Sequence, residues 1–181
     1  STRPDGDRSI WNSIWKSNVP LKMRIMAWKT AIGALATNLG KAHRRIHIQR
    51  SCPICGAEIE SSFHALISCM HALRVWEGLR AIWPFAWWSL LVDSRKDWVL
   101  QLLSKCSDKT RDLVIMTIWR IWQLRNDITH GKNETPVEVT VDYLDSYYKS
   151  LNLVRNYSME EIVKGKMPLY EDSRPKCVKI T

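Results

Sequence analysis

Apolar side chains recur every three or four positions along most of the 181-residue chain, which is the spacing of helices that bury one face. Prolines, glycines and capping residues separate these runs. The pattern predicts helices over residues 9–16, 20–32, 38–44, 69–83, 94–106, 108–129, 135–156 and 158–165. A further helix is expected to begin at residues 60–62, and Thr37 is expected to cap the third helix. The predicted fold class is therefore mostly α.

The same spacing assigns an inward face to each helix. In the second helix this face is predicted to be Leu21, Ile25, Trp28 and Ile32. In the helix after Cys69 it is Leu73, Trp76, Leu79 and Trp83. In the helix over residues 108–129 it is Leu113, Met116, Trp119 and Leu124. Two short segments break the helical spacing. Ile46 and Ile48 alternate with polar neighbours, as in a short strand, and residues 83–88 are expected to form a loop or a boundary.

Composition fits a folded, helix-rich protein, with 45% hydrophobic residues and only seven glycines and seven prolines. No apolar run approaches the length that spans a bilayer, and the first residues do not resemble a signal peptide. The five cysteines are an odd number, so a disulfide framework is not expected. We therefore expect an intracellular protein of the nucleus or cytoplasm, without a membrane partner.

Positive charge is concentrated in one part of the chain. No Asp or Glu occurs from Arg8 to Ala57, whereas nine Lys and Arg do, and the rest of the chain is neutral, so this segment carries the formal net charge of +9. Such asymmetry favours a polyanionic partner, most often nucleic acid, either RNA or DNA. The side chains predicted to contact it are Lys22, Arg24, Lys29, Lys41, Arg44, Arg45 and Arg50. The alternative is a solvated basic face that only keeps the domain in solution.

The most specific motif is C-x2-C-x8-H-x4-C, formed by Cys52, Cys55, His64 and Cys69. Two thiols separated by two residues can bind one metal ion from a single turn, and the second pair can complete a tetrahedron. Pro53 and Gly56 give the first pair its turn chemistry. Four protein ligands leave no open position for water or substrate, so the motif predicts a structural Zn²⁺ knuckle.

Two other interpretations of this motif stay open. The cysteines could be reduced core residues beside a packed histidine, or His71 could replace His64 as the fourth ligand. No catalytic constellation accompanies the motif. The chain has no clustered aspartates of the polymerase kind, no glycine-rich phosphate loop and no local Ser-His-Asp signature. We therefore expect neither an enzyme nor a small-molecule substrate.

The zinc motif lies within a longer frame that resembles a known family. The frame consists of Trp11, Trp15, Val19-Pro20-x-Lys22, Trp28, Ala34, Leu35, Thr37, Leu39, the Cys52-x2-Cys55-Gly56 turn, Glu60-Ser61, His64, Cys69 and Trp76. In this order the residues resemble the zinc-binding domain that follows the reverse transcriptase in plant non-LTR (LINE-type) retroelement polyproteins. The resemblance covers about residues 9–85. The chain departs from the family pattern at Met26 and Ala65, and in the basic density of residues 37–50.

The resemblance extends more weakly downstream. Trp119-x2-Trp122-x2-Arg125-Asn126 resembles the helix that usually follows this domain, and residues 174–180 resemble the first strand of an RNase H domain. The implied domains are a zinc-binding domain at 1–92, a helical extension at 93–165 and an extended tail or linker at 166–181. The resemblance implies an accessory role beside polymerase and RNase H, and such domains also occur in domesticated host proteins.

Three functions follow, in order of preference. The first is a zinc-organised module that grips RNA or DNA phosphates. The second is a protein-interaction module, domesticated within a larger host protein. Trp87 and Trp88, which have no periodic partner, are its candidate contact residues. The third is a structural spacer between two enzymatic domains.

Overall fold

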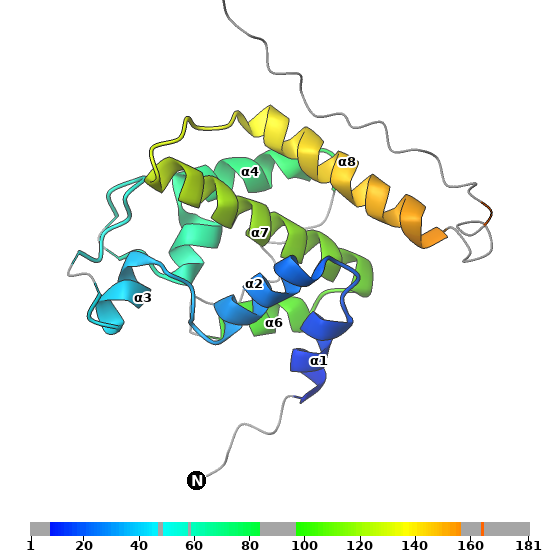
Figure 1. The fold of residues 1–181 in the computed structure, drawn as a ribbon, viewed down its shortest axis with the longest axis horizontal. Coiled ribbons are helices and arrows are strands. Elements are labelled where there is room, and N and C mark those ends of the chain that lie inside the picture. The colour runs from blue at the N-terminus through cyan, green and yellow to red at the C-terminus, as the bar shows by residue number, and fades with distance from the viewer. Residues whose placement is uncertain (1–7, 47–48, 58, 84–96, 157–163, 165–181) are drawn as a thin grey trace, which may run out of the picture. The chain divides into compact units, whose positions relative to one another are not determined.

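The computed structural model describes residues 8–46, 49–57, 59–83, 97–156 and 164. Their elements, in chain order, are α1 (Arg8–Lys16), α2 (Leu21–Ala31), α3 (Asn38–His43), the π-helical turn η2 (His64–Ser68), α4 (Met70–Arg80), α6 (Trp98–Ser104), α7 (Asp108–Thr129) and α8 (Val137–Asn156). The described part of the chain contains no strand. The predicted mostly α fold is confirmed (Figure 1).

The chain divides into two units, residues 1–148 and 149–181. In the second unit the structure describes only the end of α8 and Lys164. The boundaries inferred from the resemblance, at residues 92 and 165, stay predictions. None of the described helices is long and apolar enough to cross a membrane.

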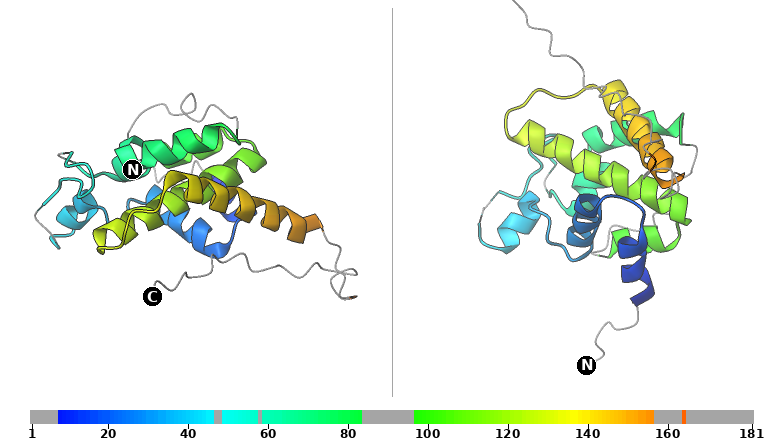
Figure 2. Two further views of the ribbon diagram at one scale, coloured as in Figure 1. Left: turned by 90° about the horizontal axis from the view of Figure 1, so that it is seen from above. Right: turned by 45° about the vertical axis from the view of Figure 1, so that its right-hand side comes forward.

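Helix α7 forms the centre of the first unit. It contacts α2, η2 and α4, while α1 and α2 also contact α6 (Figure 2). Its middle is buried on every side, because all eight consecutive residues from Asp112 to Trp119 are buried. A helix that is apolar all round can only be stable when neighbours cover each face. The predicted inward residues of this helix, Leu113, Met116, Trp119 and Leu124, are buried as expected.

Helix α2 has the predicted position but presents the opposite face to the core. Leu21, Ile25 and Ile32, predicted to point inward, are 56%, 36% and 47% exposed. The buried residues are Met23, Met26, Ala27 and Thr30. Both sets follow helical spacing, so periodicity alone could not choose between them. The buried set has adaptable methionines and small side chains, which allow α2 to approach α6 and α7 closely.

Two smaller predictions also fail. In α4, Trp76 and Leu79 are buried as expected, together with Trp83 just beyond the helix, but Leu73 is 36% exposed. Ile46 is 70% exposed in a bend after α3, so the expected strand does not begin there. Ile48, Trp87, Trp88 and the beginning of the helix expected at 94–106 lie outside the described residues. So does the helix expected at 158–165, apart from Lys164.

Candidate metal centre

A tight turn presents the first two cysteines. The N–H of Cys52 donates to the carbonyl of Ala57 at 2.8 Å, and the N–H of Gly56 donates back to the carbonyl of Cys52 at 3.0 Å. Gly56 has φ of +76°, in the left-handed region that a residue with a Cβ adopts only at a cost. The backbone N–H groups of Ile54 and Cys55 donate to the Cys52 sulfur. The turn therefore holds the Cys52 thiol in place before any ion binds.

A π-helical turn presents the other two side chains. Ser61 begins it by accepting a hydrogen bond from the His64 N–H at 3.0 Å. The N–H of Cys69 then donates to the carbonyl of His64 at 2.8 Å, an i+5 bond. This wider turn brings His64 and Cys69 to the same side, which a regular α-helix would not do for residues five apart. Trp76 of α4 donates to the carbonyl of Leu66 at 2.9 Å and so fixes η2 against α4.

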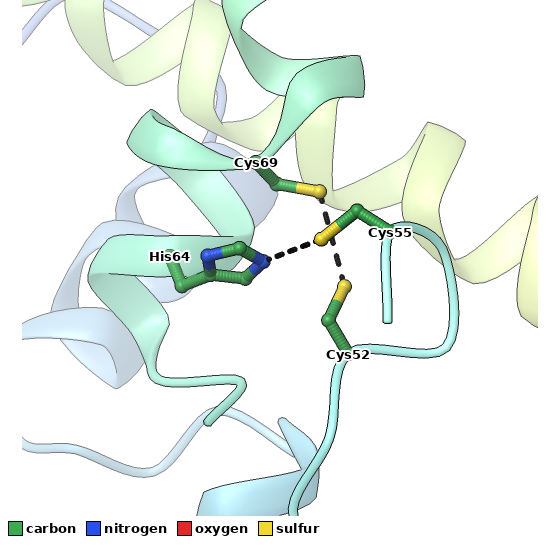
Figure 3. A group of neighbouring side chains, drawn as sticks. All are labelled: Cys52, Cys55, His64 and Cys69. Atoms are coloured by element: carbon green, nitrogen blue, oxygen red, sulfur yellow. Dashed lines mark hydrogen bonds between the residues drawn. The ribbon is translucent and has the colours of Figure 1, made fainter. Parts of the chain in front are cut away.

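The four predicted ligands converge on one point (Figure 3). The ligand atoms of Cys52, Cys55, His64 and Cys69 all lie within 4.8 Å of one another. The Cys52 and Cys69 sulfurs are 3.8 Å apart, and the Cys55 sulfur is 3.2 Å from His64 Nε2. Two sulfurs bound tetrahedrally to Zn²⁺ at about 2.3 Å would lie about 3.8 Å apart, and a sulfur and a nitrogen about 3.6 Å apart. The group forms a potential tetrahedral zinc site.

The surroundings of the four ligands differ. Burial raises the pKa of Cys52, and it raises the pKa of Cys69 to about 12 although the His71 N–H donates to that sulfur. Cys55 is exposed, and the partial burial of its sulfur raises its pKa. Hydrogen bonds from the Ala57 backbone and the other thiols outweigh this effect, so its pKa is lowered. Burial lowers the pKa of His64, which favours the neutral imidazole that ligates metal. Cation binding would therefore displace thiol protons, and Cys55 is the thiolate most readily formed.

His71, the alternative fourth ligand, lies outside this group of four. It is 6% exposed in α4, and burial lowers its pKa to about 4. A neutral imidazole packed at this position is a core residue. The structure therefore favours His64 as the histidine of the site.

Residues 2–76 match the family model described as zinc-binding in reverse transcriptase. This segment is similar to the zinc-binding domain of reverse transcriptases. The chain is also 25% identical over 129 residues to an Arabidopsis thaliana protein named as a ribonuclease H protein. The aligned residues cover 69% of this chain and 20% of that protein. It is 28% identical over 140 residues to the uncharacterized 149 kDa protein of transposon TX1 from Xenopus laevis, which covers 75% of this chain and 10% of that protein. No solved structure is significantly similar to the chain.

These relatives support a retroelement origin for the zinc-binding domain. The chain spans only a fifth and a tenth of their lengths, so the activities of the larger proteins do not transfer to it. The narrower assignment to plant LINE-type elements stays a prediction.

A buried ion pair joins the zinc-binding domain to α7, beyond the matched segment. Arg125 donates from Nε and Nη2 to the two carboxylate oxygens of Glu60 at 2.9 and 2.7 Å. The side chains are 3% and 0% exposed. Glu60 also accepts from the backbone N–H of Asn38 at 2.6 Å, and Asn38 donates from its side chain to the carbonyl of Ser51 at 2.7 Å. One carboxylate thus connects α7, the start of α3 and the segments flanking the metal turn.

This connection was not predicted. Glu60 belongs to the frame that carries the family resemblance and Arg125 to its weaker downstream extension, but they are 65 residues apart. Both stand among polar neighbours in the sequence, so no local pattern marked them as a buried pair.

The structure separates the predicted phosphate contacts into two groups. On α2, Lys22 lies 4.7 Å over the Trp119 ring, and Arg24 is half-buried and donates to the carbonyl of Trp15 at 2.8 Å. Exposed Lys29 lies on the same helix. Lys22 and Arg24 therefore also have roles in packing, since each contacts another helix.

The second group lies on and after α3. Arg44, Arg45 and Arg50 are exposed, and Lys41 is half-buried. Arg44 donates to the carbonyl of Gly33 at 3.4 Å, which connects the end of α3 to the end of α2. Among the residues that the structure describes, none of the seven predicted phosphate contacts makes an ion pair. No acidic side chain of the described residues therefore pairs with their positive charge.

Helix α3 ends with an arginine where a glycine is usual. The N–H of Arg45 donates to the carbonyl of Ala42 at 3.0 Å, and the N–H of Ile46 donates to that of Lys41 at 3.0 Å, which is the Schellman pattern. Arg45 has φ of +57° and is the sole residue other than glycine with positive φ in the described chain. This conformation costs roughly 1 kcal/mol for a residue with a Cβ. Its side chain is exposed, as is that of Arg44.

Proposed function

We propose that the chain is a non-catalytic module in which Zn²⁺, held by Cys52, Cys55, His64 and Cys69, organises a basic surface that binds RNA or DNA. The observation that carries this proposal is the cluster of cations on and after α3, directly before the metal turn, which have no ion-pair partner among the described residues. When bound, the ion would supply a fixed four-ligand cross-link between the turn and η2, and no open position for chemistry.

The surface would bind phosphates rather than read bases through hydrogen bonds in a groove. Exposed Arg44, Arg45 and Arg50 provide long cationic side chains without a rigid recognition helix around them. Lys41 and Lys29 extend this surface, and Lys22 and Arg24 contribute at its edge. The expected partner is a polyanion at whose surface each cation releases condensed counterions.

Charge reversal tests this function. Arg44→Glu with Arg45→Glu should lower affinity for all nucleic-acid sequences and reduce the salt slope by about 2, because two phosphate contacts are lost. A matched control, Lys105→Glu with Lys109→Glu, makes the same charge change at the junction between α6 and α7 and should leave most of the affinity. Fluorescence anisotropy across a salt series measures both. Equal losses in the two variants would mean that net charge, and no defined surface, drives binding.

The outward apolar face of α2 favours a second candidate function, a protein-interaction module. Leu21, Ile25 and Ile32 form an exposed stripe at helical spacing, and Trp15 of α1 is 40% exposed. A contiguous apolar stripe on a folded domain is typical of a protein contact. A pulldown with purified chain, repeated after nuclease treatment and at high salt, distinguishes the two functions. A defined partner that survives both treatments supports the second, and its loss with nuclease supports the first.

A further inference from the structure

A cavity of about 450 Å³ lies beside the basic end of α3. Its lining comes from the end of α2, from α3, from residues 61–63 before η2 and from Trp98 at the start of α6. Pockets that hold small molecules or cofactors have volumes of about 300–1,000 Å³. The cavity is therefore large enough for one nucleobase with part of its sugar.

The walls combine apolar surface with fixed polar groups, as a base requires. Ile32, Leu39 and Phe63 supply apolar surface. Phe63 is held by Trp98, whose ring meets it edge to face at 5.5 Å, and Trp98 in turn donates to the Ser62 hydroxyl at 3.2 Å. An aromatic ring with a fixed orientation offers a face on which any base can stack.

Hydroxyl groups provide the polar edge of the cavity. Thr37 accepts from the Gly40 N–H at 3.1 Å, and Ser61 accepts from the His64 N–H at 3.0 Å. These bonds fix the oxygens, while a hydroxyl that accepts can still donate its proton. Both residues line the cavity together with exposed His43, whose ring can donate or accept. Such groups match the donors and acceptors at the edges of a base.

The charge around the opening identifies the class of ligand. The carbonyl that Arg44 contacts belongs to Gly33, a lining residue, so this guanidinium lies at the cavity. Arg45 follows it, and Lys41 is on the same helix. Among the described residues, none that lines the cavity is acidic. An apolar hollow next to unpaired cations is complementary to a base attached to its phosphates.

We propose that this cavity accepts one unpaired base of a single-stranded nucleic acid while Arg44, Arg45 and Lys41 hold the adjoining phosphates. The inference rests on the proposed function and narrows it to single strands or unpaired loops. A base within a duplex could enter only after it had been unpaired and unstacked, which costs free energy. Stacking on protein aromatics is worth about 1–3 kcal/mol per base, so a single strand should bind about tenfold more tightly than a duplex of equal length.

Ala31→Phe tests the inference, because Ala31 lines the cavity and a phenyl group would fill it. The control is Ala81→Phe, the same change at an exposed position that is not part of the lining. The zinc-loaded 181-residue chain is titrated with three oligonucleotides of equal length: a single strand, the same strand with abasic sites, and a duplex. The single strand should bind about tenfold more tightly than the other two, and only Ala31→Phe should remove this difference. A 2-aminopurine base in the strand should change its fluorescence on binding to wild type and to the control, but not to Ala31→Phe.

The outcomes separate the two proposals. If all three oligonucleotides bind with equal, salt-dependent affinity, the basic surface stands and the base pocket is wrong. If no oligonucleotide binds in a salt-dependent way, the proposed function fails as well. If Ala31→Phe lowers the melting temperature of the protein, the titrations are repeated with His43→Ala, a substitution at the exposed rim of the cavity. An unchanged preference for single strands in that variant, with the 2-aminopurine signal intact, would overturn the cavity assignment.

Discussion

Two polar regions of the domain hold their charges in opposite ways. Around the metal turn, the three thiols and the imidazole face one another, and Glu60 faces Arg125. Most of these side chains are buried. On and after α3, arginines extend into solvent without an ion-pair partner among the described residues. A buried charge destabilises the fold unless it is paired, whereas an exposed cation keeps its charge available to a ligand. The comparison separates groups that hold the structure from groups that can bind a partner.

Loss of one ligand should have the largest effect. Cys52→Ser removes a buried sulfur from the tetrahedron, and metal ligation in small structural sites is worth about 10–16 kcal/mol of apparent binding free energy. The variant should lose its zinc and much of its helical circular dichroism. Cys106→Ser is the matched control, because Cys106 is also buried but lies outside the group of four.

Metal content by elemental analysis, beside far-ultraviolet spectra, measures both variants. One zinc per chain in Cys52→Ser would show that this thiol is not a ligand. Equal zinc loss in the Cys106 variant would show that destabilisation, and not ligation, governs the metal content.

The buried ion pair should come next. Arg125→Met leaves the Glu60 carboxylate without its guanidinium, and an unpaired buried charge costs about 3–5 kcal/mol. The control, Arg80→Met, breaks an exposed pair with Glu77 at 3.6 Å and should cost less than about 1 kcal/mol. Urea denaturation of zinc-loaded protein gives both free energies of unfolding.

A double variant can separate the loss of the ion pair from the loss of side-chain packing around Arg125. The double variant Glu60→Gln with Arg125→Met should recover part of the loss, because it removes the isolated charge. If Arg125→Met costs no more than Arg80→Met, the pair does not anchor the metal turn to α7.

The sequence predicted the ligand set because the chemistry is local. Cys52, Cys55 and Gly56 form a turn by themselves, and His64 and Cys69 follow at a fixed distance along the chain. Helix positions were predictable for a similar reason, since Pro20, Thr37 and Gly131 end or begin helices through their own backbone preferences. The bounds predicted for the helix over residues 108–129 match α7.

What the sequence did not predict depends on contacts between distant segments. The choice between the two faces of α2 is made by α6 and α7, which come more than sixty residues later. The Glu60–Arg125 pair needs two segments 65 residues apart. The π-helical turn at His64 places His64 and Cys69 on the same side as the other two ligands. Its own residues, His-Ala-Leu-Ile-Ser, carry no signal for a π-helix. The cavity beside α3 is bounded by segments that span residues 31–98.

Substitution of Arg45 should have an intermediate effect, and it should change stability and nucleic-acid binding in opposite directions. Arg45→Gly relieves the positive φ at the end of α3, so the free energy of unfolding should rise by roughly 1 kcal/mol. The same change removes a guanidinium from the proposed phosphate surface and should lower the salt slope by about 1. Arg45→Ala, which keeps the strained backbone but loses the charge, is the control and should weaken binding without stabilising. Unfolding titrations and anisotropy measure the two quantities on the same samples. Stabilisation without loss of affinity would place Arg45 outside the binding surface.

The smallest change in stability should come from the outward face of α2, and it addresses the second candidate function. Ile25 is 36% exposed, whereas its neighbour Met26 is 6% exposed against α6 and α7. Ile25→Ser should therefore lower the free energy of unfolding by no more than about 1 kcal/mol, because about a third of this side chain already lies in solvent and the serine leaves no enclosed cavity. Met26→Ser, one residue along the same helix, should cost about 2–5 kcal/mol through the cavity that it leaves. If the two variants are equally destabilised, α2 is packed on both faces and its stripe is not a contact surface. If Ile25→Ser folds normally but loses a nuclease-resistant protein partner, the stripe has a binding role separate from the cations of α3.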